Sequence, residues 1–207
     1  MEKTRTGGFS FIELMVTMAV VAILIGILAP NMRVFLLNNQ LSGGVNDMLH
    51  SIQVARTEAI KRQLPAGGGV VVCGTAAPTV ADAALSCDYA TFKAWFVFVD
   101  ANANWQHDAN EPVIERHGLL DASVSVKTDA NARIVSFAAS GFANPAGVRV
   151  PMRTLVLCDS RGVQQTTGTN ATARALFIAT TGRARASSTW NDVKIVALPL
   201  VVGGSCP

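Results

Sequence analysis

The first third of the chain divides into two segments that differ in the spacing of their apolar residues. From Phe9 to Ala29 nearly every residue is apolar, and Glu13 is the only charged residue in the run. At about 1.5 Å per residue, a helix of this length measures roughly 30 Å, which is the thickness of the hydrocarbon core of a bilayer. We therefore predict a membrane-spanning helix over residues 9–30.

After Pro30 the apolar residues recur every three or four positions, the spacing of one face of a helix. We predict that residues 31–64 continue the helix as an amphipathic segment whose apolar stripe packs on a globular domain. The residues between, Arg56 among them, are expected to face solvent or other subunits. The stripe consists of Val34, Leu37, Leu41, Val45, Met48, Ile52, Ala55 and Ala59.

Residues 65–207 consist of short apolar runs separated by clusters of Gly, Asn, Asp, Pro and Thr, as is typical of antiparallel sheet. A domain of about 140 residues is large enough to bury a core. The sequence therefore predicts an α+β fold, with the long N-terminal helix packed on one antiparallel β-sheet domain. The expected strands are residues 70–73, 94–99, 122–127, 133–137, 154–158, 175–179 and 193–202.

Glu13 distinguishes the apolar run from a simple anchor. A carboxylate in hydrocarbon costs about 2 to 3 kcal/mol near the bilayer centre and less near the interface, so it needs a partner. A cleaved signal peptide has a shorter apolar region followed by a cleavage site, and a signal anchor held by Lys3 and Arg5 leaves Glu13 unpaired. Cleavage after Gly8 would free the amine of Phe9, and this amine would supply the missing positive charge.

These features, in this order, resemble the start of type IV pilins and type II secretion pseudopilins: a charged leader, Gly8, Phe9, Glu13 and an uninterrupted apolar span. The resemblance implies that residues 1–8 are a prepilin leader and that prepilin peptidase cleaves between Gly8 and Phe9. It also implies that Phe9 is N-methylated and that Glu13 pairs with a terminal amine during assembly. Residues 53–62, 95–100 and 157–162 are similar to the GspH/FimT branch of minor pilins and pseudopilins.

The resemblance further implies a location and a set of partners. Such a subunit waits in the bacterial inner membrane as a single-pass protein with a periplasmic globular domain, and then enters an extracellular or periplasmic filament. Its partners are prepilin peptidase, other minor pilins or pseudopilins, the major subunit and the membrane. We expect a position at the filament tip and a priming role. A type IV pilus and a type II secretion pseudopilus both stay open, because they use the same helix and maturation.

The chain has four cysteines, none of them in a C-x-x-C pair, which argues against zinc and for disulfides in the periplasm. Four cysteines permit three pairings, and four buried thiols are the alternative. We favour Cys73 with Cys87 and Cys158 with Cys206. The second bridge would join the terminal strand to the sheet, and the loop-entropy treatment assigns it about 4 kcal/mol.

One stretch has the oxygen spacing of a calcium loop: Asp100, Asn102, Asn104, Asp108 and Glu111. A tryptophan occupies the position where such a loop needs glycine, and the flanking residues indicate strands rather than helices. Asn and Asp are also common in ordinary turns, where they bond to the local backbone. We favour an ordinary turn over a metal site, and we expect no cofactor.

The C-terminal part is basic, since residues 130–207 hold seven Arg and one Lys against two Asp. Arginine forks suit phosphate oxygens, and the run from Gly182 to Arg185 is similar to the Gly-Arg-x-Arg element with which DNA-uptake members of the FimT subgroup hold DNA. The similarity implies that Arg183 and Arg185 contact phosphates, that Gly182 allows the turn, and that Arg174 or Lys194 extends the patch. The alternatives are a charged sheet edge and a membrane-anchored DNA receptor.

The sequence offers little for catalysis. It contains no Walker A loop, no H-E-x-x-H and no G-x-S-x-G. Its three histidines are scattered over a predicted helix, a turn and a strand end. We therefore expect no catalytic residue and no enzymatic activity.

Overall fold

The computed structural model describes residues 8–65, 67–88, 92–128, 134–143, 152–200 and 206. It forms two compact units, residues 1–38 and residues 39–207, and helix α1 (Phe11–Arg62) runs from the first into the second. Most of the predicted leader, residues 1–7, lies outside the described residues. The amphipathic continuation of the helix thus belongs with the β domain from Asn39 onward.

In the first unit, α1 carries its apolar side chains on the surface. Exposure is 83% at Phe9, 64% at Ile23 and 53% at Leu36, and every other large apolar side chain described between them is exposed as well. Among the described residues, α1 is the one helix long and apolar enough to cross a membrane. Within the described part of this unit, nothing covers its apolar surface.

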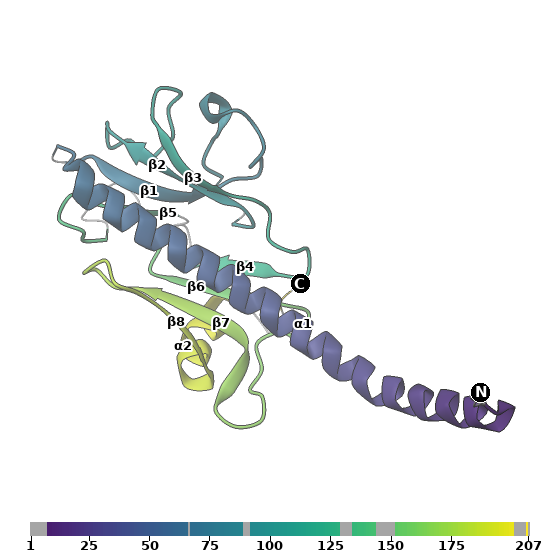
Figure 1. The fold of residues 1–207 in the computed structure, drawn as a ribbon. Helices are drawn as coiled ribbons and strands as arrows, with labels where there is room; N and C mark the ends of the chain where they lie inside the picture. Colours follow the sequence, from purple (N-terminus) through teal and green to yellow (C-terminus); the bar gives the residue numbers. More distant parts are fainter. Residues whose placement is uncertain are drawn as a thin grey trace, which may run out of the picture. The chain divides into compact units, whose positions relative to one another are not determined.

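The second unit contains two four-stranded antiparallel sheets (Figure 1), with strand orders β3-β2-β1-β5 and β4-β6-β7-β8. A short 3₁₀ helix, η1 (Asp82–Ala84), lies between β1 and β2, and helix α2 (Trp190–Leu200) follows β8. The strands are β1 (Gly69–Gly74), β2 (Trp95–Asp100), β3 (Val113–His117), β4 (Ser125–Thr128), β5 (Ile134–Phe137), β6 (Thr154–Cys158), β7 (Asn170–Ile178) and β8 (Ala184–Thr189).

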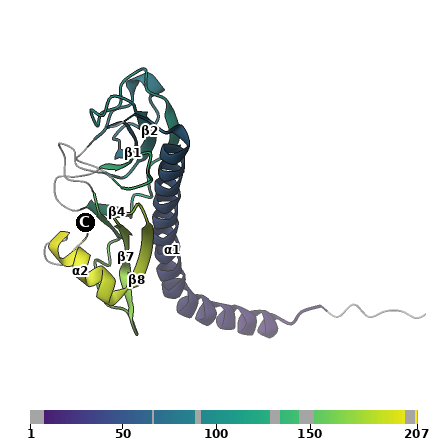
Figure 2. The same cartoon turned by 90° about the vertical axis from the view of Figure 1, so that its left-hand side faces the viewer.

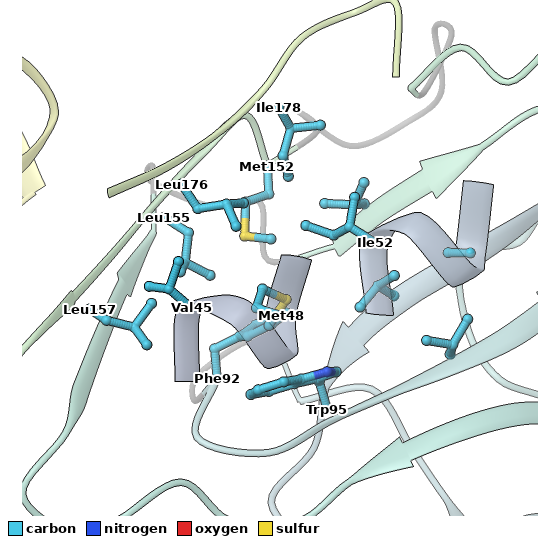
Figure 3. Close-up of a cluster of buried hydrophobic side chains, with 14 of the residues drawn as sticks. Val45, Met48, Ile52, Phe92, Trp95, Met152, Leu155, Leu157, Leu176 and Ile178 are labelled. Carbon is cyan, nitrogen blue, oxygen red and sulfur yellow. The ribbon is translucent and has the colours of Figure 1, made fainter. Parts of the chain in front are cut away.

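The main core lies between α1 and both sheets (Figure 3). Leu41, Val45, Met48 and Ile52 of α1 are at most 2% exposed. They pack with Trp95 and other residues of the first sheet and with residues of the second, so one helix face joins the two sheets. The sheet residues in this cluster include Val70, Val72, Val97, Val135, Phe137, Leu155, Leu157, Leu176 and Ile178. The predicted stripe is thus confirmed from Leu41 to Ala59.

Both sheets are covered on their second face too. Val71 and Cys73 of β1 alternate with Val70 and Val72, and they face a smaller cluster formed with loops of the first sheet. On the second sheet, α2 packs through Val193, and Figure 2 shows α1 and α2 on opposite sides of β7 and β8. Burial on both faces explains why β1 and β2 are continuous apolar runs rather than alternating ones.

The predicted strand over residues 193–202 is wrong, because residues 190–200 form α2. A short apolar run fits a buried strand and a buried helix equally well, and here Trp190 and Val193, three residues apart, both pack on the sheet. Strands β3 and β8 were not predicted. Strand β3 contains Glu115 and Arg116, and β8 consists mainly of small and polar residues. The predicted strand 122–127 begins only at Ser125, and Arg133 lies outside the described residues.

The two favoured disulfides are confirmed, since Cys73 is bonded to Cys87 and Cys158 to Cys206. The Cα atoms are 5.6 Å apart in the first bridge and 6.0 Å apart in the second, within the ordinary range. The second bridge joins β6 to a residue beyond α2, and not to a terminal strand as expected. The segment that contains α2 is therefore tied to the second sheet on both sides, by β8 before the helix and by the disulfide to β6 after it.

Candidate functional site

The first candidate site is the beginning of α1. Phe9 and Ser10 precede the helix, and the Leu14 N–H donates to the Ser10 carbonyl at 3.1 Å, which closes the first turn. Glu13 lies in that turn and is exposed. An acid at a helix N-terminus is favoured by the positive end of the helix dipole, and no ion pair between described residues involves Glu13.

The second candidate site is the turn between β7 and β8. Gly182 is buried at φ +78°, a conformation that side chains rarely adopt. Its N–H donates to the Ala179 carbonyl at 2.9 Å, and the Ala179 N–H donates to the Arg183 carbonyl at 2.9 Å. A Cβ at position 182 would overlap the carbonyl oxygen of Gly141. The turn therefore needs glycine for its backbone conformation and for its close packing.

Arg56 holds this turn, although it was expected to face solvent or other subunits. Its Nε donates to the Gly141 carbonyl at 3.0 Å and its Nη2 to the Thr181 carbonyl at 3.3 Å. One helix side chain thus binds a loop from each sheet. The sequence offered no signal for this role, because the partners are backbone carbonyls about 85 and 125 residues away.

The two arginines of the turn differ in their contacts. Arg183 is exposed, and no ion pair between described residues involves it. Arg185 is 60% exposed, bonds Asp192 of α2 at 2.8 Å and places its guanidinium carbon 4.3 Å from the ring centroid of Phe177. The hydrogen bond from Arg185, followed by that from Ser187, lowers the pKa of Asp192. The carboxylate of Asp192 therefore already binds part of the Arg185 guanidinium group.

Arg174 does not lie beside this turn. Phe177 is opposite Arg185 in the ladder, so these two face α2. Arg174 alternates with Ala175, and it faces α1 together with Leu176. Lys194 is exposed on α2. Arg185 and Arg174 are therefore on opposite faces of the second sheet.

The residues of the candidate calcium loop bond to one another and to the local backbone. Asp100 accepts two backbone N–H groups of the loop, at 3.2 and 3.0 Å, and burial raises its pKa. Asn102 and Asn104 donate to the carboxylate of Asp108 at 2.7 and 2.9 Å, and Glu111 accepts two further backbone N–H groups. This is the arrangement of a turn closed by its own side chains.

Two of the three histidines, His107 and His117, take part in packing, and His50 is exposed. His117 stacks on Trp95 with ring centroids 3.8 Å apart, and it pairs with Asp47 of α1. His107 bonds two backbone carbonyls, of Leu85 and Glu111. Within the described ranges, no three His, Cys, Asp or Glu side chains are grouped so that they could hold a metal ion.

An exposed apolar helix with an acid in its first turn, continuing into a disulfide-bonded β domain, is the architecture of a type IV pilin-like subunit. The chain belongs to the GspH family: the profile described as type II transport protein GspH matches residues 44–182. The profile of the prokaryotic N-terminal methylation motif matches residues 3–29. Family and fold are those of structural pilin subunits.

Solved structures similar to this chain include the type IV minor pilin FimU of Pseudomonas aeruginosa in two crystal forms. In the P2₁ form, the match has 20% identity and a TM-score of 0.48, covering 72% of this chain and 89% of FimU. In the P6₅ form, the match has 18% identity and a TM-score of 0.46, covering 71% of this chain and 92% of FimU. No curated protein sequence matches the chain.

Proposed function

We propose that this chain is a minor pilin-like subunit that enters a type IV pilus by the first part of α1, at the tip, and primes assembly of the filament. The observation that carries the proposal is the uncovered apolar surface between Phe9 and Leu36, with Glu13 as its one acid. In the inner membrane, lipid covers this surface and the globular domain lies in the periplasm. In the filament, the helices of neighbouring subunits cover it.

Glu13 gives this insertion its direction and register. Cleavage between Gly8 and Phe9 creates an amine one helical turn from Glu13, and N-methylation leaves that amine positively charged. Such a pair in a low-dielectric helix bundle is far stronger than in water, whereas one unpaired charge is costly. A subunit whose Glu13 meets the amine of a neighbour is therefore stabilised in one register only.

Replacement of Glu13 tests this mechanism. We expect Glu13→Ala to enter the membrane normally and to be absent from sheared filaments by immunoblotting, because it lacks the charge partner. Thr17→Ala is the matched control, since the Thr17 hydroxyl bonds within its own helix, to the Leu14 carbonyl at 2.9 Å. Incorporation of Glu13→Ala at the level of Thr17→Ala would remove the proposed role of the charge pair.

A minor pseudopilin of a type II secretion system is the second candidate, favoured by the description of the family that the chain matches. Deletion of the gene separates the two. A pilus subunit leaves the cells with fewer surface filaments and normal protein secretion. A pseudopilin leaves exoproteins in the periplasm and the surface filaments unchanged.

We further propose that the turn at Gly182 contacts the phosphates of DNA at the tip. Arg183 is exposed and without an ion pair among the described residues, and the close packing of Gly182 against Gly141 fixes the turn in place. Binding is sequence-independent, and each phosphate neutralised adds about 0.9 to the slope of log affinity against log salt for duplex DNA. Asp192 competes with DNA for Arg185.

A mobility-shift titration with the full chain in neutral detergent tests DNA contact. We expect Arg183→Gln with Arg185→Gln to lose binding, and Asp192→Asn to strengthen it because the competing carboxylate is gone. Lys93→Gln with Lys127→Gln removes the same charge elsewhere, with Lys127 on β4 at the other edge of the second sheet, and should bind as the wild type. Equal binding by both double variants, or none by the wild type, contradicts the proposal.

A receptor that stays in the membrane is the alternative to a tip subunit that holds DNA. Crosslinking to DNA in cells that cannot build filaments distinguishes them. A tip subunit requires the filament for crosslinking, whereas a membrane receptor does not.

A further inference from the structure

The second unit has a cleft of about 250 Å³ beside the amphipathic part of α1. One wall is formed by Ser42, Val45 and Asn46 of α1. The other is formed by residues of β7 and β8: Arg174, Ala186, Ser187 and Ser188. Hydroxyl, amide and guanidinium groups predominate in this lining, so the cleft suits a charged group better than an apolar side chain.

Arg174 lies at a bulge in the ladder between β7 and β8. Residues 171–174 of β7 are opposite Ser188 alone, because the pairing shifts between Asn170 and Ala175. Nη1 of Arg174 donates to two carbonyls of the bulge, of Ala171 at 3.0 Å and of Ala173 at 3.1 Å. Bulges commonly re-aim side chains next to functional sites. Both bonds use the single nitrogen Nη1. A guanidinium group has five N–H donors on its three nitrogen atoms, so these two bonds do not use all of them.

The charge of Arg174 is not balanced within the described part of the chain. Burial, followed by the positive charge of Arg161, lowers its pKa, and Asp159 only partly offsets them. The Asp159 carboxylate is itself bound by Nε and Nη2 of Arg161. No ion pair between described residues includes Arg174. A half-buried cation of this kind is stabilised by an anion that enters the cleft.

We propose that this cleft binds the phosphate of an anionic phospholipid headgroup, with Arg174 as the cation and Ser42, Asn46 and Ser188 as hydrogen-bond donors. The lipid source rests on the membrane storage proposed above. The exposed apolar surface of α1 that lipid would cover ends at Leu36, six residues before Ser42, so a bilayer that covers this surface brings its headgroups towards this part of the chain. Arg185, which the proposed DNA contact uses, lies by contrast on the other face of the sheet.

Native mass spectrometry of the full chain tests the site. The protein is released from neutral detergent micelles that contain equal amounts of phosphatidylglycerol and phosphatidylcholine. We expect the wild type to retain phosphatidylglycerol about tenfold better, the equivalent of one charge-assisted hydrogen bond. Arg174→Gln should lose this preference, and Arg183→Gln, which removes the same charge outside the cleft, should keep it.

A second variant keeps the test decisive if loss of Arg174 unfolds the bulge. Asn46→Leu leaves Arg174 and its carbonyl bonds in place and blocks the α1 wall, so it too should abolish the preference. Tryptophan fluorescence checks the fold, since all three tryptophans, Trp95, Trp105 and Trp190, lie in the second unit.

The remaining outcomes each overturn one statement. Equal retention of the two lipids by the wild type, together with no effect of inorganic phosphate on its unfolding temperature, overturns the site. An Arg174-dependent rise in unfolding temperature with inorganic phosphate, without a lipid preference, overturns the lipid source in favour of a free phosphate. Displacement of the lipid by duplex DNA overturns it in favour of DNA. Recovery of the whole chain in the soluble fraction refutes membrane storage itself, and not the cleft.

Discussion

The two parts of α1 are both apolar, but among the described residues only one of them is packed against other elements of the chain. From Leu41 to Ala59 the apolar stripe is buried against both sheets, whereas from Phe9 to Leu36 the large apolar side chains are exposed. The second part therefore stabilises the β domain, and the first contributes nothing to it. A surface of this size that remains uncovered marks an interface with lipid or with other subunits. Stability and assembly can thus be altered separately in one helix.

Removal of a disulfide should produce the largest effect confined to the second unit. Cys158→Ser with Cys206→Ser opens a loop of 48 residues and should lower the free energy of unfolding by about 4 kcal/mol. Tryptophan fluorescence in micelles measures this, while circular dichroism of the denatured domain should retain the helical signal of residues 11–37. Loss of both signals together would show that the two parts of α1 are not independent.

Truncation of one isoleucine in each part of α1 should give the next largest effect on stability. Ile52 is 1% exposed and Ile23 is 64% exposed. Ile52→Ala should destabilise the domain by about 3 kcal/mol, since it deletes buried methyl groups and leaves a cavity. Ile23→Ala should change stability by less than about 0.5 kcal/mol, and a larger change measured by urea unfolding would contradict the comparison.

The adjacent residues Gly43 and Gly44 of α1 give a smaller difference of the same kind, because only one of them is packed against the sheet. A Cβ at Gly44 would lie 2.9 Å from Leu157 and 3.0 Å from Leu120, whereas at Gly43 it would meet nothing. Gly44→Val should therefore cost about 1 to 3 kcal/mol by overpacking. Gly43→Ala should raise stability by about 1 kcal/mol through helix propensity. Equal effects of the two changes on the unfolding midpoint would argue against a close helix–sheet contact here.

The smallest effect concerns pH. The pKa of Asp192 is lowered by Arg185, so the pair stabilises the folded state above the unfolded pKa of about 4. This stability is lost as pH falls through the lower folded pKa. Asp192→Asn should therefore flatten the acid limb of the stability curve slightly, and it should leave the helical signal of the first unit unchanged. An unaltered acid limb in thermal unfolding would show that the pair contributes nothing.

The sequence predicted those parts of the fold that depend on apolar spacing. The stripe from Leu41 to Ala59 and the runs of β1, β2 and β6 were visible because burial requires apolar residues at a regular period. Strand β3 and strand β8 escaped prediction because half-exposed strands carry no such signal. The α2 segment was misassigned because its apolar run has no period that separates helix from strand.

The sites were predictable to different degrees. Gly8, Phe9 and Glu13 stand out as candidates because one acid in an apolar run is rare, and their roles in processing and assembly stay predictions. The role of Gly182 followed from its neighbours in sequence, but its partner Gly141 and the donor Arg56 could not be found without the fold, since they meet through backbone carbonyls. The separation of Arg174 from Arg185 depends on strand register, which composition does not encode.

The proposed assembly through the first part of α1 depends on cleavage before Phe9. Mass spectrometry of the protein recovered from membranes measures this directly. It should show a chain that begins at Phe9 with one added methyl group on the terminal nitrogen. A chain that still carries Met1 would lack the amine that Glu13 needs, and it would contradict the account.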